Sequence, residues 1–425
     1  MLVDRMSNQI LWLVYTGLPD GWQVPLIALL VLNAVVFPYF LFLLATSLAA
    51  IFASRRESPP ADPTAKILIA IPAHDEETGI STTVRSCLES NYPASLFGVT
   101  VIADNCTDRT AALARDAGAQ VVERFDDLKK SKGYAIEYLF ESLGRSGELD
   151  SLNAVVIVDA DTTIDPTLLR SFDQALGEGH DWMQAYYTVA NPDQSWRTRL
   201  MTYALSLFNG VMQIGQNALG SSAGFKGNGM CFSTRGLRRV PWKSYGLVED
   251  MEYSWNLRTA GEKVIFLPRA VVYGAMLGSG GTAAANQRRR WEYGRAEIRN
   301  KFLGRMVQSS HLGWFEKTLA ACELTIPSMA VLAALYVFVA GFDAVAWLQL
   351  RGSQFAVSGG CLLASAAFLT LSLATYAISP FLVLRLPLRY LASTLLFPLY
   401  LFWKLVVAFG GRPQQWVRTA REAHR

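Results

Sequence analysis

Two aspartates one residue apart follow a short apolar run in the segment AVVIVDADTTIDP, which covers residues 154–166. Asp159 and Asp161 come directly after five aliphatic residues that are typical of a buried strand. Two carboxylates at this spacing repel each other unless a cation lies between them. Hard divalent cations such as Mg²⁺ and Mn²⁺ prefer oxygen ligands and are often bound together with substrate phosphates. The pattern therefore predicts a Mg²⁺ or Mn²⁺ site at Asp159 and Asp161 that also binds the diphosphate of a nucleotide.

A pattern as short as D-x-D occurs by chance, so its weight depends on other polar residues in similar places. Asp104 ends an earlier apolar run, where its carboxylate can accept hydrogen bonds from a base or a ribose. Lys132 and Gly133 follow a polar stretch, and a cation beside a flexible glycine suits a phosphate. For Lys132 a second interpretation stays open, a solvated turn within the charged run LKKSKG.

A further acidic pair, Glu249 and Asp250, opens a predicted helix that ends at Gly261. At a helix start, acidic side chains complement the helix dipole, which is worth about 0.3–1 kcal/mol. A carboxylate at the rim of a pocket can instead act as a general base and take the proton of an attacking hydroxyl. Both interpretations of Asp250 remain open on the sequence alone.

Two more segments have compositions suited to ligand contact. Residues 222–236, SAGFKGNGMCFSTRG, hold four glycines among apolar residues, which predicts backbone close to a ligand. Residues 286–295, NQRRRWEYGR, combine arginines that can neutralise a departing diphosphate with a tryptophan that offers a flat face to a sugar ring. As an alternative, this run is a basic collar before the membrane segments, as the positive-inside rule expects.

The elements that must position these residues alternate between strand and helix. Residues 66–77, KILIAIPAHDEE, are an apolar run with a polar turn, and the next thirteen residues have apolar side chains at helical spacing. Residues 97–119 repeat this arrangement, and the run at 154–158 begins a third unit. The alternation predicts an α/β fold with a parallel, doubly wound sheet, in which ligands bind at the carboxyl ends of the strands. We therefore expect the three acidic loops to lie at one edge of the sheet.

The composition indicates that part of the chain lies in lipid, since 51% of its 425 residues are hydrophobic and 17% are charged. Residues 23–54 hold no charged side chain and are long enough to cross a bilayer. The run is too long for a secretory signal and lacks a basic region before it, so we interpret it as an uncleaved anchor. Arg55 and Arg56 follow at once and predict that the next part of the chain is cytoplasmic.

Two further apolar segments, residues 324–350 and 355–384, are predicted to span the membrane. Residues 390–410 contain Lys404 and precede a basic tail, so this segment either crosses or lies along the interface. The predicted domains are an anchor at 1–56, a cytoplasmic α/β domain with interfacial helices at its end at 57–317, membrane helices at 318–410 and a basic tail at 411–425.

Several classes of function are disfavoured. The net charge is only +4 and no basic stripe is interleaved with aromatic residues, so nucleic acid is not an expected partner. Five cysteines are scattered without C-x-x-C spacing among only four histidines, which predicts neither a zinc site nor a disulfide framework.

Taken in order, these motifs resemble the D, D-x-D, [T/E]-E-D and Q-x-x-R-W elements of the membrane-bound family 2 glycosyltransferases. This group includes the synthases of cellulose, hyaluronan and poly-N-acetylglucosamine, and the ceramide glucosyltransferases. The matching residues are Asp104, Asp159 and Asp161, Glu249 and Asp250, and Gln287, Arg290 and Trp291. The resemblance covers about residues 66–300 and implies a GT-A type nucleotide-sugar domain flanked by transmembrane helices. The segments ADNCTD and VED depart from the commoner forms of two of these elements. These departures bear on which sugar and which acceptor the protein uses, and not on the class of reaction.

The resemblance also implies roles for single residues. The residues expected at the nucleotide-sugar are Asp75, Glu77, Asp104, Lys132, Asp159 and Asp161, of which Asp159 and Asp161 bind Mg²⁺ or Mn²⁺. Asp250 would be the catalytic base, with Glu249 beside it. The residues expected at the diphosphate and the acceptor are Gly227, Asn228, Gly229, Gln287, Arg290 and Trp291.

The activity that the resemblance implies is that of an inverting, UDP-sugar-dependent hexosyltransferase in the inner membrane, with its catalytic domain in the cytoplasm. Two acceptors stay open. The favoured one is a growing polysaccharide, handled with an export partner or a homo-oligomer, and the other is a membrane lipid that receives a single sugar. A membrane scaffold that has kept the fold without catalysis is a third possibility, which the intact acidic set disfavours.

Overall fold

The computed structural model describes residues 23–53, 62–278, 281–352, 356–400 and 403. The chain divides into two compact units. The first consists of Met1–Leu48 and Thr325–Ile378, and the second of Ala49–Leu324 and Ser379–Arg425.

The second unit is built on an eight-stranded sheet with the order β3-β2-β1-β4-β7-β6-β8-β5. Its strands are β1 (Ile67–Ala73), β2 (Phe97–Asp104), β3 (Gln120–Arg124), β4 (Ala154–Ile157), β5 (Thr162–Ile164), β6 (Trp182–Val189), β7 (Met230–Ser233) and β8 (Ile265–Gly274). β1 pairs in parallel with β2 and β4, and β2 pairs in parallel with β3, which confirms the prediction for this half of the sheet. The prediction of parallel strands throughout is wrong, because β7 runs antiparallel to both β4 and β6.

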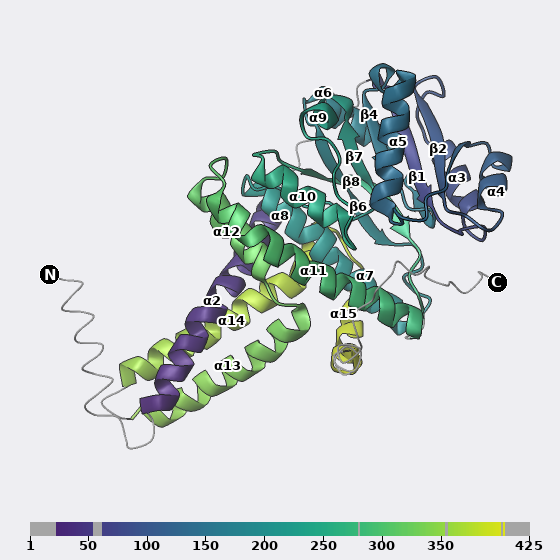
Figure 1. The fold of residues 1–425 in the computed structure, drawn as a ribbon. Helices are drawn as coiled ribbons and strands as arrows, with labels where there is room; N and C mark the ends of the chain where they lie inside the picture. The colour runs from purple at the N-terminus through teal and green to yellow at the C-terminus, as the bar shows by residue number, and fades with distance from the viewer. Residues whose placement is uncertain (1–22, 54–61, 279–280, 353–355, 401–402, 404–425) are drawn as a thin grey trace. The chain divides into compact units, whose positions relative to one another are not determined.

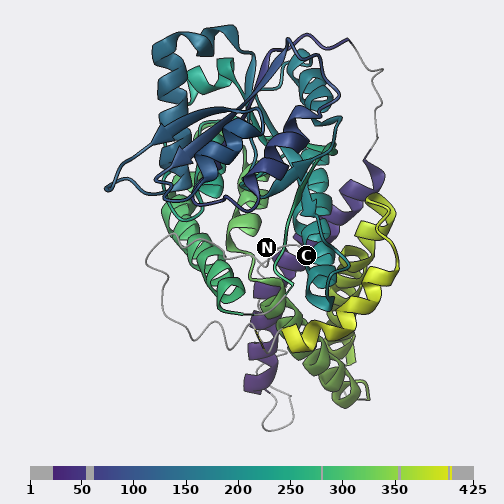
Figure 2. The same cartoon turned by 90° about the vertical axis from the view of Figure 1, so that its right-hand side faces the viewer.

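Helices cover both faces of this sheet (Figure 2). The helices of the second unit are α3 (Ile80–Leu88), α4 (Thr110–Asp116), α5 (Lys132–Ser146), α6 (Leu168–Gly177), α7 (Trp196–Leu205), α8 (Met212–Ala218), α9 (Thr234–Arg239), α10 (Glu249–Thr259), α11 (Thr282–Gln308), α12 (Trp314–Thr325) and α15 (Arg389–Ala392), with the shorter η1 (Glu148–Ser151), η3 (Ser393–Leu396) and a π-helical turn η2 (Ser206–Val211). Along β1, Ile69 packs in the same core as α3 and α6, whereas Ala70 packs in the core that contains α5. This alternation follows from the two-residue period of a strand.

The start of α5 places one predicted site residue with little freedom. Ser131 is the N-cap, and its side chain accepts a hydrogen bond from the backbone N–H of Tyr134. Lys132 is therefore fixed at the first position of the helix. Gly133 follows it where a Cβ would lie 2.1 Å from the carbonyl oxygen of Ser244, so only glycine fits.

Three helices, most of whose residues belong to the first unit, are long and apolar enough to cross a membrane (Figure 1). They are α2 (Gln23–Phe52), α13 (Met329–Leu350) and α14 (Ala356–Val383), and they match the three apolar segments predicted from the sequence. Of the fourth predicted segment, 390–410, the structure describes the short helices α15 and η3, while residues 401–402 and 404–410 lie outside the described residues.

A polar contact joins these three helices. Asn33 of α2 donates a hydrogen bond to Asp343 Oδ1 of α13 at 3.0 Å, and Ser365 of α14 donates to Asn33 Oδ1. The side chain of Asp343 is fully buried. Interhelical hydrogen bonds between membrane helices contribute on average about 0.6 kcal/mol, so the contact helps to set which faces of the helices meet.

Two glycines of α5 provide a matched test of the close contact at Gly133. Gly133→Ala is expected to lower the free energy of unfolding by about 1–3 kcal/mol, because the new methyl group meets backbone atoms that cannot move away. Gly144→Ala on the same helix meets nothing within 4 Å and is expected to stabilise by about 0.5–1 kcal/mol. Thermal unfolding of the purified variants measures both. Equal midpoints for the two variants would contradict the contact.

Candidate active site

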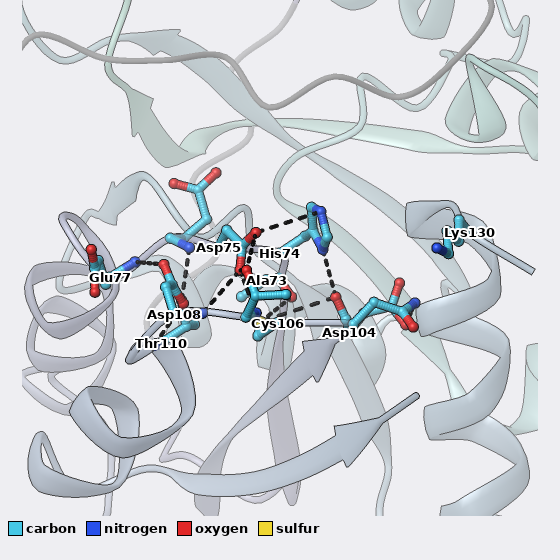
Figure 3. Close-up of polar contacts among 12 residues, drawn as sticks. Ala73, His74, Asp75, Glu77, Asp104, Cys106, Asp108, Thr110 and Lys130 are labelled. Carbon is cyan, nitrogen blue, oxygen red and sulfur yellow. Dashed lines mark hydrogen bonds and ion pairs between the residues drawn. The ribbon is translucent and has the colours of Figure 1, made fainter. Parts of the chain in front are cut away.

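The loops that follow β1 and β2 are fastened to each other by the predicted acidic residues (Figure 3). Asp75 Oδ1 accepts a hydrogen bond from the backbone N–H of Thr107 at 2.7 Å. Glu77 Oε2 accepts one from the backbone N–H of Arg109 at 3.3 Å. Since Thr107 and Arg109 lie in the loop after Asp104, the structure brings Asp75, Glu77 and the end of β2 together, as expected for parallel neighbours.

Asp104 is held by an arginine that the sequence analysis did not identify. Arg124, the last residue of β3, lies 2.6 Å from Asp104 Oδ1, and both side chains are at least nine-tenths buried. The amide of Asn105 donates to the same oxygen at 3.1 Å. Burial raises the pKa of Asp104, and Arg124 works against that rise by favouring the charged carboxylate.

A cluster near these loops could be taken for a metal site, because Asp75, Cys106 and Asp108 offer ligand atoms within 4.8 Å of one another (Figure 3). Its chemistry does not suit a divalent cation. Burial raises the pKa of the Cys106 thiol to about 11, and a thiol is a soft ligand that the hard cations Mg²⁺ and Mn²⁺ do not favour. Asp108 Oδ2 already accepts from the backbone N–H of Glu77, and Asp108 Oδ1 accepts from Thr110 N at 2.9 Å. These hydrogen bonds hold the loops after β1 and β2 together.

Lys132 lies at the centre of the remaining predicted residues. Its ammonium group donates hydrogen bonds to Asp159 Oδ1 and to the carbonyl oxygen of Gly227, and it lies 3.8 Å from Glu249 Oε1. Burial opposes its charge, but Asp159 and Glu249 outweigh burial and raise the pKa of Lys132 above its usual value. Of the two interpretations of Lys132, the solvated turn is therefore wrong, because its side chain is only 15% exposed.

Glu249 and Asp250 are the first two residues of α10 and face this cluster. A Cβ on Gly227, which has φ +78°, would lie 3.4 Å from Asp250 Oδ2. The glycine loop, residues 227–229, therefore passes directly beside this carboxylate. Burial raises the pKa of both carboxyls, and the positive charge of Lys132 opposes the rise at each. A carboxylate whose pKa is raised in this way is a better proton acceptor than an exposed one.

The other two residues of the glycine loop lie deeper. Asn228 is fully buried, and its side chain bonds to the backbone N–H of Asp159 at 3.2 Å. Gly229 has φ +66°, and a Cβ there would lie 2.7 Å from the Cβ of Ala185 on β6. The loop thus brings Gly227 to the acidic residues while Asn228 and Gly229 pack behind it.

α11 contributes the last group of predicted residues. Gln287, Arg290 and Trp291 are half-buried and lie one turn apart on this helix, so they share a face. The positive charge of Arg290 opposes the rise in the pKa of Glu249 and of Tyr187, so Arg290 is within electrostatic range of the acidic cluster. A Cβ at Gly294 would lie 2.5 Å from Val248, so α11 packs directly on the residue before Glu249.

Besides Arg124, sequence reasoning missed Tyr187 and Lys226. Burial raises the pKa of Tyr187 on β6, and the negative charge of nearby Asp159 raises it further. Lys226 lies near Asp250 and Glu323, and burial lowers its pKa while those two carboxylates oppose the change. Lys226 stands within the glycine-rich segment, where a charged residue among apolar ones was the available signal. Tyr187 had no comparable signal, because aromatic residues are ordinary in strands.

The donor set of the D-x-D residues suits a hard divalent cation. Asp159 and Asp161 provide carboxylate oxygens, which are the ligands that Mg²⁺ and Mn²⁺ prefer. Lys132 bonds to only one oxygen of Asp159. The residues present therefore fit Mg²⁺ or Mn²⁺ better than the Asp75, Cys106 and Asp108 cluster does.

Comparison with known proteins agrees with this arrangement. Probable glycosyltransferase YdaM of Bacillus subtilis (strain 168) is 24% identical over 259 residues, which cover 57% of this chain and 58% of that protein. Glucomannan 4-beta-mannosyltransferase 7 of Arabidopsis thaliana is 22% identical over 262 residues, 59% of this chain and 46% of that protein. The chain thus spans about half of the length of the curated relatives that it matches.

Among solved structures, the mannosyltransferase PcManGT from Pyrobaculum calidifontis in complex with GDP-Man and Mn²⁺ has a TM-score of 0.51. It is 16% identical, and the alignment covers 83% of this chain and 98% of that one. At this identity the likeness shows a shared fold, and the expected GT-A type domain is confirmed.

The family described as "Glycosyltransferase like family 2" matches residues 63–294. This range contains the D-x-D residues, the Glu249 and Asp250 pair and the start of α11. Since the match covers more than half of the chain, the protein belongs to glycosyltransferase family 2.

Proposed function

We propose that the protein transfers a sugar from a UDP-sugar to a growing polysaccharide, with inversion at the anomeric carbon. The observation that carries the proposal is the position of Asp250, whose carboxylate lies beside Gly227 in the same cluster as Lys132 and Asp159. A base and a diphosphate site that adjoin each other are what a single displacement requires.

In this reaction Asp250 accepts the proton of an acceptor hydroxyl, with Glu249 beside it. The hydroxyl oxygen forms a bond to the anomeric carbon while the bond from that carbon to the diphosphate breaks, and its electron pair leaves with the diphosphate. Asp159 and Asp161 would hold Mg²⁺ or Mn²⁺, which neutralises charge on the leaving group when bound. Lys132 and Arg290 add positive charge at the same place.

The remaining assignments extend this proposal. Asp75, Glu77 and Asp104 contact the nucleotide, and Gly227, Gln287 and Trp291 border the acceptor and the diphosphate. The domain within 57–317 is cytoplasmic, and the apolar helices anchor it in the inner membrane, where the polymer is exported with a partner protein or a second copy of the chain.

Two features of the relatives bear on the choice of substrates. The Arabidopsis relative is named for a polysaccharide, glucomannan, which supports a polymer as acceptor. The Pyrobaculum structure contains GDP-Man, so GDP-sugars must be tested beside UDP-sugars. A membrane lipid that receives one sugar is the alternative acceptor, and it predicts a different product.

Product partitioning tests the proposal. Membranes that contain the protein are incubated with Mn²⁺ or Mg²⁺ and a panel of radiolabelled UDP- and GDP-sugars, then extracted with organic solvent and sized. Label in a large water-soluble product supports the polymer and identifies the donor. Label of low mass in the organic phase would contradict the polymer and support the lipid acceptor, and label in neither would contradict transfer from these donors.

The role of Asp250 predicts a large loss of rate on removal of its charge. Asp250→Asn is expected to lower kcat by about 10²–10⁴-fold, because the amide cannot accept the hydroxyl proton. Asp127→Asn is the matched control, since the Asp127 side chain is 95% exposed and lies outside the cluster. Unchanged transfer by Asp250→Asn would rule out Asp250 as the base.

Removal of the divalent cation gives a second test. Treatment with EDTA is expected to abolish transfer, and added Mn²⁺ or Mg²⁺ is expected to restore it, because the D-x-D carboxylates bind the diphosphate through the cation. Radiolabelled sugar transfer measures both steps. Full activity in EDTA would contradict the metal role of Asp159 and Asp161.

The electrostatics of Asp250 predict a shift in pH dependence. Transfer requires ionised Asp250, so kcat/KM falls as the pH drops through its pKa. Lys226 holds that pKa down, and Lys226→Met is therefore expected to move the acidic limb of the kcat/KM profile to higher pH. Lys263→Met is the control, because Lys263 is exposed and bonds to Gly220. An acidic limb that stays in place or moves to lower pH would contradict this coupling.

A further inference from the structure

One buried amide contacts both halves of the D-x-D segment. Asn228 Oδ1 accepts a hydrogen bond from the backbone N–H of Asp159 at 3.2 Å. Its Nδ2 donates to Thr162 Oγ1, directly after Asp161, at 2.7 Å. The backbone carbonyl of Asn228 is itself held by Gln184 Nε2 at 2.8 Å, so the amide has little freedom to turn.

The direction of these hydrogen bonds is fixed. Thr162 is fully buried, and its hydroxyl oxygen accepts from Asn228, so its own proton points elsewhere. The hydroxyl donates that proton to Asp161 Oδ1 at 3.1 Å. The amide of Asn228, the hydroxyl of Thr162 and the carboxylate of Asp161 therefore form a continuous series of hydrogen bonds. Bonds in such a series strengthen one another.

We infer that Asn228 and Thr162 are positioning residues for the diphosphate and cation site, in which the amide and the hydroxyl orient Asp161 relative to Asp159. The inference rests on the proposed function, because the site is the one that binds Mg²⁺ or Mn²⁺ with the nucleotide. The hydrogen bond from Thr162 to Oδ1 restricts rotation of the Asp161 carboxylate and so helps to fix its orientation. Partners of this kind around metal ligands typically contribute 10–100-fold to affinity or activity.

This role differs from simple packing in what it predicts. A packing role for Thr162 depends on its volume, which valine reproduces. An orienting role depends on the hydroxyl, which serine reproduces and valine does not. Thr162→Val and Thr162→Ser therefore separate the two, and binding of the cation is the quantity that orientation changes most directly.

The experiment measures the dissociation constant of Mn²⁺ for the purified full-length protein in detergent, by electron paramagnetic resonance of free Mn²⁺, with UDP and separately with GDP. Thr162→Val is expected to weaken Mn²⁺ binding by about tenfold. Thr162→Ser is expected to bind as the wild type does. Thr100→Val is the matched control, because Thr100 is a buried strand threonine of β2 whose hydroxyl lies 3.5 Å from Gln120.

A second variant tests whether the hydrogen bonds from Asn228 through Thr162 to Asp161 act as a unit. Asn228→Ala removes the amide that directs the Thr162 hydroxyl, so it is also expected to weaken Mn²⁺ binding. Both residues act through Asp161. The fold loss of Mn²⁺ affinity in the double variant is therefore expected to be smaller than the product of the fold losses in the two single variants. A fold loss in the double variant equal to that product would overturn the coupling of Asn228 and Thr162 through Asp161. Thr162→Ala, which adds no carbon to the site, replaces Thr162→Val if the valine variant does not fold.

The outcomes separate this inference from the proposed function. Unchanged Mn²⁺ affinity in a folded Thr162→Val protein, with the wild type binding Mn²⁺ normally, would overturn the inference alone. Equal weakening by valine and serine would likewise overturn it, because volume and not the hydroxyl would then decide. A wild-type protein that transfers sugar in EDTA and binds no Mn²⁺ would overturn the metal role and the inference together.

Discussion

The need to compensate buried negative charge governs the structure around the site. Asp159, Glu249 and Asp250 lie together, and the side chain of Glu249 is only 12% exposed, so a carboxylate there without a counter-charge is disfavoured. The ammonium group of Lys132 provides that counter-charge, since it contacts Asp159 and lies 3.8 Å from Glu249. Its place depends on the cap at Ser131 and on Gly133, whose missing side chain allows α5 to approach the backbone of Ser244.

The backbone around the site follows from the same requirement. Gly227 has φ +78° and offers its carbonyl oxygen to Lys132, so the loop adds a dipole to the charges that the lysine already meets. α11 completes the arrangement by close contact, because Gly294 lets it pack on Val248 and Arg290 then acts on Glu249.

The sequence predicts the local parts of this structure well and the long-range parts poorly. β1, β2 and β4 follow from aliphatic runs, and α10 begins at Glu249 and ends just before Gly261, as its pattern indicates. The antiparallel β7 was not predicted, because strand direction depends on pairing and not on composition. Arg124 beside Asp104 and Asn228 beside Thr162 are contacts between segments 20 and 66 residues apart, so no local period reports them.

The polar contact of the membrane helices has a consequence for how the protein is made. Asn33 and Asp343 are 310 residues apart in the chain, and Ser365 follows later still. At about 5–20 residues per second, the ribosome takes on the order of tens of seconds to synthesise the intervening chain. The amide of Asn33 therefore enters the bilayer well before either partner exists. An uncharged amide is tolerable in a mainly apolar helix for that interval, whereas the carboxylate of Asp343 is inserted only when its partner is already in place.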